Sequence, residues 1–274
     1  MRAAHRLRTA VRCVERGGAV EAMKSTAAAF GGAPEVRYER RGPVALLLID
    51  RPYAANAFGP GAVREFGRHL ETIRTDDTVT GVIVTGAGVR HFCSGGDVKA
   101  YSVFASAAEL NPVFDEARAV LNELDLLTVP TVAAINGVAI GGGFELALAC
   151  DFRIAHVSAT LSLPQVRMGI VPGWFAIERL ITICGRANAK RFALSGARIP
   201  ADEALRLGAV DQISDGDVVE AALAFLKQFE GADRRGVGAF KRIVRELADN
   251  GREAAQRLER DVFAELWFHP ERKR

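Results

Sequence analysis

Short apolar runs alternate with amphipathic stretches through the first half of the chain. Residues 44–49, 81–85 and 131–135 are runs of aliphatic or β-branched side chains, which predict buried strands. Between them, residues 61–73 and 110–127 carry apolar side chains at helical spacing. Alternation of strands and helices is typical of βαβ units, and it therefore predicts an α/β fold with a mainly parallel sheet.

The pattern changes after Asp151. Residues 152–155 and 160–163 are expected to continue the sheet, whereas from Trp174 onward the spacing is almost wholly helical. Gly208 is expected to end a short helix over residues 201–207. The predicted organisation has three parts, which are a flexible extension over residues 1–35, an α/β core with the active site over 36–200, and a helical part over 201–274 with helices at 218–229, 236–247 and 252–267.

Composition excludes several classes of protein. The 274 residues are 49% hydrophobic and 25% charged, with a net charge of +3, which is ordinary for a globular chain. Lys and Arg are spread along the sequence rather than clustered, so we do not expect nucleic acid as a partner. The longest apolar runs, such as Val44–Ile49, are far too short to span a bilayer, so we do not expect a membrane as a partner either. The cysteines form no C-x-x-C pair and predict reduced thiols; they are Cys13, Cys93, Cys150 and Cys184.

The first residues have a composition of their own. Residues 1–20 contain five arginines, and the first acidic residue is Glu15. An Arg-rich, acid-poor start is typical of mitochondrial transit peptides, so the mitochondrial matrix is one interpretation. Glu15 and Glu21 interrupt that pattern, and Met23 offers a second start. We therefore favour an ordinary extension and a cytoplasmic protein.

Two glycine-rich turns are the most informative motifs. Ser94–Asp97 and Gly141–Glu145 each follow a short apolar run and open a polar or helical stretch. A turn that leads from a strand into a helix leaves backbone N–H groups without partners, and these attract negative charge. Two such turns brought together could place one N–H each on a single carbonyl oxygen, which is the geometry of an oxyanion hole. Either turn alone could equally be a tight connection.

The segments around these turns resemble the crotonase, or enoyl-CoA hydratase/isomerase, superfamily. Five segments match in the family's order and cover roughly residues 36 to 268; they are Val44–Ala57, Val82–Lys99, Ala133–Asp151, Leu163–Gly173 and Ala201–Val210. The resemblance implies a crotonase-type ββα spiral core whose C-terminal helical part serves oligomerisation and the CoA pocket. It also implies a homotrimer or hexamer and an acyl-CoA thioester substrate, with coenzyme A as part of the substrate and no separate cofactor.

The resemblance also assigns roles to individual residues. The N–H groups of Gly96 and Gly142 match the family's oxyanion hole, and Glu145 matches the first of its two acid/base glutamates. Burial among apolar neighbours would raise the pKa of Glu145 toward a useful range. A carboxylate near a helix N-terminus is also favoured electrostatically, so capping is the alternative role of Glu145.

Gln165 is the departure from the family pattern. It stands where the second glutamate is expected, and an amide cannot give or take a proton at neutral pH. Hydration of an enoyl thioester remains the default activity, with Glu145 and Gln165 as the catalytic pair. The alternatives are double-bond isomerisation, decarboxylation of a malonyl-type thioester, and a binding protein with little catalysis.

Three neighbouring positions complete the predicted site. Gly173 matches a family glycine whose N–H helps to position water or substrate. Trp174 and Phe175 replace the small residues that are common after it, and they are either plain core or the wall of a narrow acyl pocket. His91 and His156 lack partners at metal-ligand spacing, so no metal site is predicted.

Overall fold

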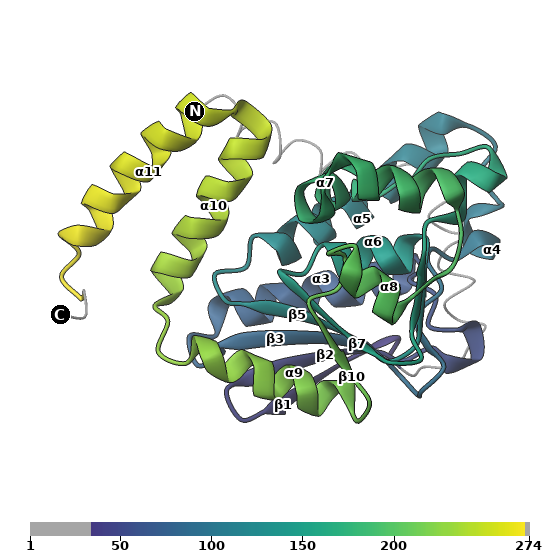
Figure 1. Ribbon diagram of the computed structural model, residues 1–274, viewed down its shortest axis with the longest axis horizontal. Helices are drawn as coiled ribbons and strands as arrows, with labels where there is room; N and C mark the ends of the chain where they lie inside the picture. The colour runs from purple at the N-terminus through teal and green to yellow at the C-terminus, as the bar shows by residue number, and fades with distance from the viewer. Residues whose placement is uncertain (1–33, 272–274) are drawn as a thin grey trace.

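The structure, a computed structural model, describes residues 34–271 and is a mixed α/β fold (Figure 1). The predicted N-terminal extension therefore lies almost entirely outside the described residues. The larger sheet has six strands in the order β1-β2-β3-β5-β7-β10. Its strands are β1 Val36–Arg41, β2 Val44–Ile49, β3 Gly81–Gly86, β5 Thr131–Ile135, β7 Phe152–His156 and β10 Gln212–Ser214.

A smaller sheet of four short strands, in the order β4-β6-β8-β9, carries the two glycine turns. Its strands are β4 His91–Cys93, β6 Val138–Ile140, β8 Thr160–Ser162 and β9 Ile199–Pro200. Parallel pairing dominates both sheets, and only β1 and β9 run antiparallel to their neighbours. The predicted α/β class with a mainly parallel sheet is thus confirmed.

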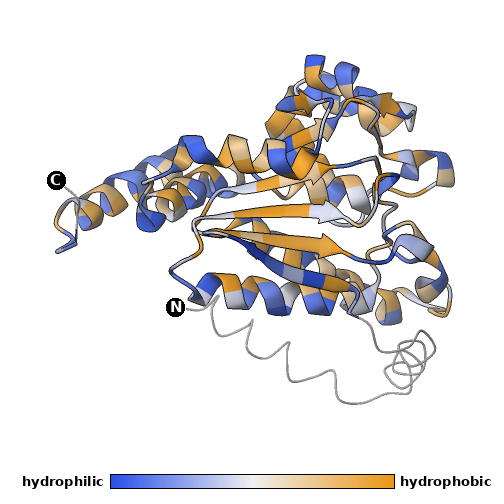
Figure 2. Cartoon of the chain, turned by 90° about the horizontal axis from the view of Figure 1, so that it is seen from below, coloured by the Kyte–Doolittle hydropathy of each residue, from blue (hydrophilic) through white to orange (hydrophobic). Residues whose placement is uncertain are grey.

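Helices cover both faces of the larger sheet. One face packs against α3, α5 and α6 in the main apolar cluster, and the other packs against α9, where Val218, Ala222 and Leu226 meet the strands. Figure 2 shows the apolar strands between these layers. The helices are α3 Pro60–Thr75, α4 Val98–Tyr101, α5 Ala107–Asp125, α6 Gly142–Leu148, α7 Ala176–Ser195, α8 Ala201–Arg206, α9 Val218–Leu226, α10 Arg234–Asn250 and α11 Arg252–Trp267, with 3₁₀ turns at Pro52–Ala54, Pro164–Met168 and Lys227–Phe229.

Two strands of the larger sheet were not expected. The sequence of β1 is VRYERR, which is mostly polar and gives no apolar run, because β1 is an edge strand with one face in solvent.

The expectation of almost wholly helical structure after Trp174 is wrong at β10, whose residues pair with β7 through Gln212–Ile154 and Ile213–Ala155. Three residues are too few for a periodic signal, so only the pairing reveals this strand. The predicted division at residue 200 stays a prediction, and β10 crosses it.

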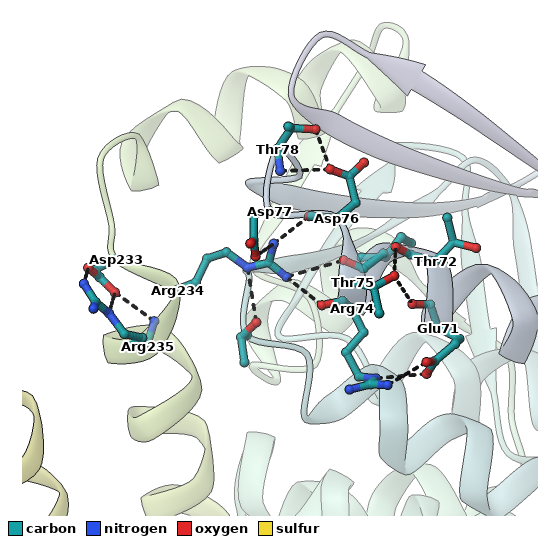
Figure 3. Close-up of polar contacts among 12 residues, drawn as sticks. Glu71, Thr72, Arg74, Thr75, Asp76, Asp77, Thr78, Asp233, Arg234 and Arg235 are labelled. Atoms are coloured by element: carbon teal, nitrogen blue, oxygen red, sulfur yellow. Dashed lines mark hydrogen bonds and ion pairs between the residues drawn. The ribbon is translucent and has the colours of Figure 1, made fainter. Parts of the chain in front are cut away.

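The last two helices form a hairpin that projects away from the sheets (Figure 1). Arg234, at the start of α10, ties this hairpin to the core (Figure 3). Its guanidinium donates to the carbonyl oxygens of Asp76 at 2.6 Å and Ile73 at 3.4 Å, and to Thr128 Oγ1 at 3.3 Å. These carbonyls lie at the C-terminal end of α3, where positive charge is favoured.

Replacing Arg234 with alanine is expected to lower the free energy of unfolding by about 1–3 kcal/mol, because several carbonyls lose a charged donor. Arg234→Lys should restore only part of this loss, since lysine cannot reproduce the planar fork. The matched control is Arg74→Ala, which breaks the exposed Arg74–Glu71 pair near the C-terminal end of α3 and should leave stability nearly unchanged. Urea denaturation followed by circular dichroism measures all three variants. Equal effects of Arg234→Ala and Arg74→Ala would contradict this role.

Candidate active site

The fold brings the two glycine turns together. Strands β4 and β6 are parallel neighbours, so the turns that follow them leave the same edge of the small sheet. Gly95, at φ +99°, lies directly against the second turn, because a methyl group on its Cα would come 3.0 Å from the Gly142 nitrogen. The Gly95 carbonyl in turn accepts a hydrogen bond of 2.8 Å from the Phe58 N–H, which holds the first turn in place.

Both predicted oxyanion donors are available. Within residues 34–271, neither the Gly96 N–H nor the Gly142 N–H donates a hydrogen bond, although Gly142 is buried. A buried N–H without a partner is uncommon and costs free energy, so such groups often mark a ligand position. Asp97, next to Gly96, caps α4 by accepting from the Ala100 N–H at 3.2 Å and pairs with Arg51 at 3.1 Å, so its carboxylate is occupied structurally.

Glu145 lies in the first turn of α6 with only 2% of its surface exposed. Three donors meet its carboxylate. Gln165 Nε2 and the Gly173 N–H donate to Oε1 at 3.0 and 3.3 Å, and the Trp174 N–H donates to Oε2 at 2.6 Å. Burial raises the pKa of Glu145, and the backbone hydrogen bonds from Trp174 and Gly173 oppose part of that rise. The result is a carboxylate held in one orientation with its proton affinity increased, which suits acid/base chemistry.

Gln165 lies in the 3₁₀ turn Pro164–Met168, and its side chain is buried. Its amide packs over Gly141, where a methyl group on Cα would come 3.5 Å from Gln165 Nε2. While Nε2 donates to Glu145, Oε1 is buried and has no partner among the described residues. This acceptor is therefore free to take a hydrogen from a water molecule or a substrate hydroxyl.

The side chains of Trp174 and Phe175 lie in different surroundings, although the two residues are adjacent in the sequence. Trp174 is buried, and its indole lies over Gly142, since a methyl group there would come 2.7 Å from Cη2. Phe175 has a left-handed backbone, with φ +67°, and its ring is 47% exposed beneath the guanidinium of Arg118, which lies 5.4 Å from the ring centroid. Only Trp174 lies beside the glycine turns.

Arg179 supports this arrangement, and sequence reasoning gave it no role. Its side chain is buried and donates from Nη1 to the Trp174 carbonyl at 2.8 Å and from Nη2 to Asn122 Oδ1 at 2.7 Å. Burial lowers the pKa of Arg179. Since the Gly173 and Trp174 N–H groups hold Glu145, Arg179 positions the donors rather than the carboxylate itself. Its placement one turn into α7, directly before the apolar residues Leu180 and Ile181, was the available signal.

No cluster that could hold a metal ion occurs among residues 34–271, and no helix in that range has the length and apolar character to cross a bilayer.

Similarity to known proteins agrees with the motifs. The sequence profile of the enoyl-CoA hydratase/isomerase family matches residues 39–274. The chain belongs to the enoyl-CoA hydratase/isomerase family.

Individual members of the family are similar over most of the chain. A short-chain-enoyl-CoA hydratase from Clostridium acetobutylicum is 37% identical over 180 residues, which cover 64% of this chain and 67% of that protein. A mitochondrial methylglutaconyl-CoA hydratase from Rattus norvegicus is 32% identical over 242 residues, covering 82% and 76%. The crystal structure of an enoyl-CoA hydratase from Bacillus anthracis superimposes with a TM-score of 0.80 at 28% identity, covering 87% and 93%. The predicted family and its hydro-lyase class of acyl-CoA enzymes are thus confirmed.

Proposed function

We propose that this family member hydrates the α,β double bond of an enoyl-CoA thioester, with Glu145 as its single acid/base. The observation that carries the proposal is the buried Glu145 carboxylate, fixed by three donors, beside the unpartnered Oε1 of Gln165 and the free N–H groups of Gly96 and Gly142. Together these groups supply a base, an acceptor that orients water, and two donors for a developing oxyanion.

In the proposed reaction, the thioester oxygen accepts hydrogen bonds from the Gly96 and Gly142 N–H groups. Glu145 takes one proton from a water molecule, whose second hydrogen is held by Gln165 Oε1. The hydroxide bonds to the β-carbon while the π electrons move toward the thioester oxygen, where the two donors stabilise the negative charge. The α-carbon then takes the proton from Glu145, so that the carboxylate is restored. The raised pKa of Glu145 helps it to hold the proton between the two steps.

A second candidate is double-bond isomerisation. One carboxylate without a second acid is sufficient to move a proton between the α- and γ-carbons, and Gln165 leaves Glu145 as the only titratable group in this pair. Decarboxylation of a malonyl-type thioester and simple binding of acyl-CoA are less favoured, because neither needs a buried carboxylate with an elevated pKa.

Turnover of crotonyl-CoA, a β,γ-enoyl-CoA and methylmalonyl-CoA tests these activities directly. We expect hydration of crotonyl-CoA, followed as loss of the enoyl thioester absorbance, to be the fastest. Faster turnover of the β,γ-enoyl thioester would favour the isomerase, and release of carbon dioxide would favour the decarboxylase. Tight binding of all three thioesters without turnover would favour the alternative that this chain binds acyl-CoA and does not catalyse a reaction.

The proposal extends to assembly and surroundings. Exposed apolar side chains along the C-terminal hairpin support a homo-oligomer, either a trimer or a hexamer, in which they are covered; they are Phe240, Val244, Leu247, Phe263, Trp267 and Phe268. The proposed chemistry requires no cofactor other than the coenzyme A carried by the substrate. We propose a cytoplasmic location, with the mitochondrial matrix as the alternative.

A further inference from the structure

A tyrosine that the proposed reaction does not use lies over the first oxyanion donor. The hydroxyl end of the Tyr101 ring faces Gly96, because a methyl group in place of the glycine hydrogen would come 2.6 Å from Cε2, 3.3 Å from the hydroxyl oxygen and 3.4 Å from Cζ. Such a methyl position lies about 2.5 Å from the backbone nitrogen of its own residue. The Tyr101 hydroxyl oxygen is therefore no more than about 5.8 Å from the Gly96 nitrogen. Two donors that each bind one oxygen at about 3 Å can lie up to about 6 Å apart, so both groups can reach the same acceptor.

Local contacts hold Tyr101 beside this donor. It is the last residue of α4, and its N–H donates to the Asp97 carbonyl at 3.0 Å. Asp97 follows Gly96 directly, so the tyrosine and the oxyanion donor are joined through one short turn. The ring also packs against Phe114, with the two centroids 5.1 Å apart, which is a favourable aromatic separation. The main chain and the ring of Tyr101 are thus both fixed near the first glycine turn.

The Tyr101 hydroxyl is an unused donor. Within the part of the chain that the structure describes, it has no hydrogen-bond partner. The neighbouring carboxylate of Asp97 is already occupied by the Ala100 N–H and by Arg51. Burial raises the pKa of Tyr101, and the negative charge of Asp97 raises it further, so the phenol keeps its proton at neutral pH. A protonated phenol beside the point where negative charge develops can donate a hydrogen bond to that charge.

The single carboxylate of the proposed reaction explains why a further donor would matter. Glu145 must first take a proton from water and then give one to the α-carbon, because the amide of Gln165 can do neither. Negative charge remains on the thioester oxygen between these two steps. Another hydrogen bond to that oxygen lowers the free energy of the charged intermediate and of the transition states beside it.

We propose that Tyr101 is a catalytic residue, and that its hydroxyl donates a third hydrogen bond to the thioester oxygen beside the N–H groups of Gly96 and Gly142. This inference rests on the proposed function. The hydroxyl keeps its proton throughout the reaction, and its hydrogen bond becomes stronger as the oxygen gains charge. Because the bond is strongest in the transition state, its loss should lower kcat and leave the affinity for the ground-state thioester nearly unchanged.

Replacing Tyr101 with phenylalanine tests this role, since it removes the hydroxyl and keeps the ring against Phe114. We expect kcat for hydration of crotonyl-CoA to fall by about 10²-fold, the lower end of what one oxyanion-hole donor contributes. The Kd for saturated butyryl-CoA, measured by calorimetry, should stay close to the wild-type value. The matched control is Tyr38→Phe, which removes a hydroxyl from a ring that stacks on His69 and lies on the edge strand β1. It should leave kcat and Kd unchanged.

The carbonyl stretching band of bound butyryl-CoA provides a readout that needs no turnover. Isotope-edited infrared spectroscopy, with the label at the thioester carbonyl carbon, isolates this band from those of the protein. Strong hydrogen bonds to the oxygen lower the stretching frequency, so the band should lie at lower frequency on the wild type than in free butyryl-CoA. Tyr101→Phe should move it part of the way back toward the free value, and Tyr38→Phe should not move it.

Wild-type kcat in a Tyr101→Phe variant that is folded by circular dichroism would overturn this inference and leave the proposed hydration intact. A carbonyl band at its wild-type position in that variant would overturn it as well, whatever the effect on kcat, because the hydroxyl would then not touch the oxygen. If the wild type does not hydrate crotonyl-CoA, the proposed function fails, and the carbonyl band by itself decides whether Tyr101 donates to the thioester oxygen.

Discussion

Replacing Glu145 with glutamine is expected to lower kcat for hydration of crotonyl-CoA by about 10²–10⁴-fold, because a positioned acid/base contributes that much. Glutamine has nearly the same shape but neither takes nor gives a proton at neutral pH. Binding of butyryl-CoA should remain close to the wild-type value, since the oxyanion donors are the backbone N–H groups of Gly96 and Gly142. Stopped-flow or steady-state loss of enoyl absorbance, together with calorimetry, separates the two effects.

The pH profile gives the same prediction a second readout. Burial raises the pKa of Glu145, and a base must be ionised to accept a proton. The wild-type kcat/KM should therefore fall as the pH decreases through this raised pKa and reach a plateau above it. Glu145→Gln should lose that limb of the profile.

The matched control for Glu145 is Glu116→Gln. Glu116 is also a partly buried glutamate whose pKa is raised by burial, but it lies on α5 and pairs with Arg64 at 3.6 Å. We expect its replacement to leave both kcat and the pH profile unchanged. Wild-type turnover in Glu145→Gln would rule out Glu145 as the acid/base.

Replacing Gln165 with glutamate is expected to raise the hydration of crotonyl-CoA by about 10²-fold, the lower end of what a positioned acid/base contributes. The amide nitrogen of Gln165 already lies 3.0 Å from Glu145 Oε1, so the new carboxyl group would occupy a place the site accommodates. Two carboxylates at this distance cannot both ionise easily, and the pair should retain a proton at neutral pH. That proton would supply a second acid beside Glu145, which in the wild type must act as both base and acid.

Gln165→Met is the control for this gain, since it preserves the length of the side chain and removes both polar atoms. It should hydrate crotonyl-CoA more slowly than the wild type, because neither Glu145 nor the water molecule has its amide partner. The Gln165→Glu variant should also acquire a falling limb at high pH, where the shared proton is lost. No gain in a folded Gln165→Glu variant that still binds butyryl-CoA would show that the amide itself is required.

The sequence by itself determined the parts of this protein that depend on local pattern. Apolar runs are sufficient to locate strands β2, β3 and β5, because a buried parallel strand is apolar on both faces. The glycine turns at Ser94–Asp97 and Gly141–Glu145 could be recognised from the sequence, because only glycine freely adopts the positive φ found at Gly95 and Gly141. The substitution of Gln165 for a carboxylate was also evident from the motif alone.

The tertiary structure decided which of these residues face one another. Trp174 and Phe175 are adjacent and both aromatic, yet one covers Gly142 and the other borders an open groove between α5 and α7. This difference follows from the left-handed backbone at Phe175, which residue type does not predict. The hydrogen bonds of Arg179, the contact of Phe114 with Gly173 and the pairing of β10 with β7 likewise join residues distant in sequence. Such long-range contacts leave no periodic trace along the chain, because they are selected by the packing of whole elements.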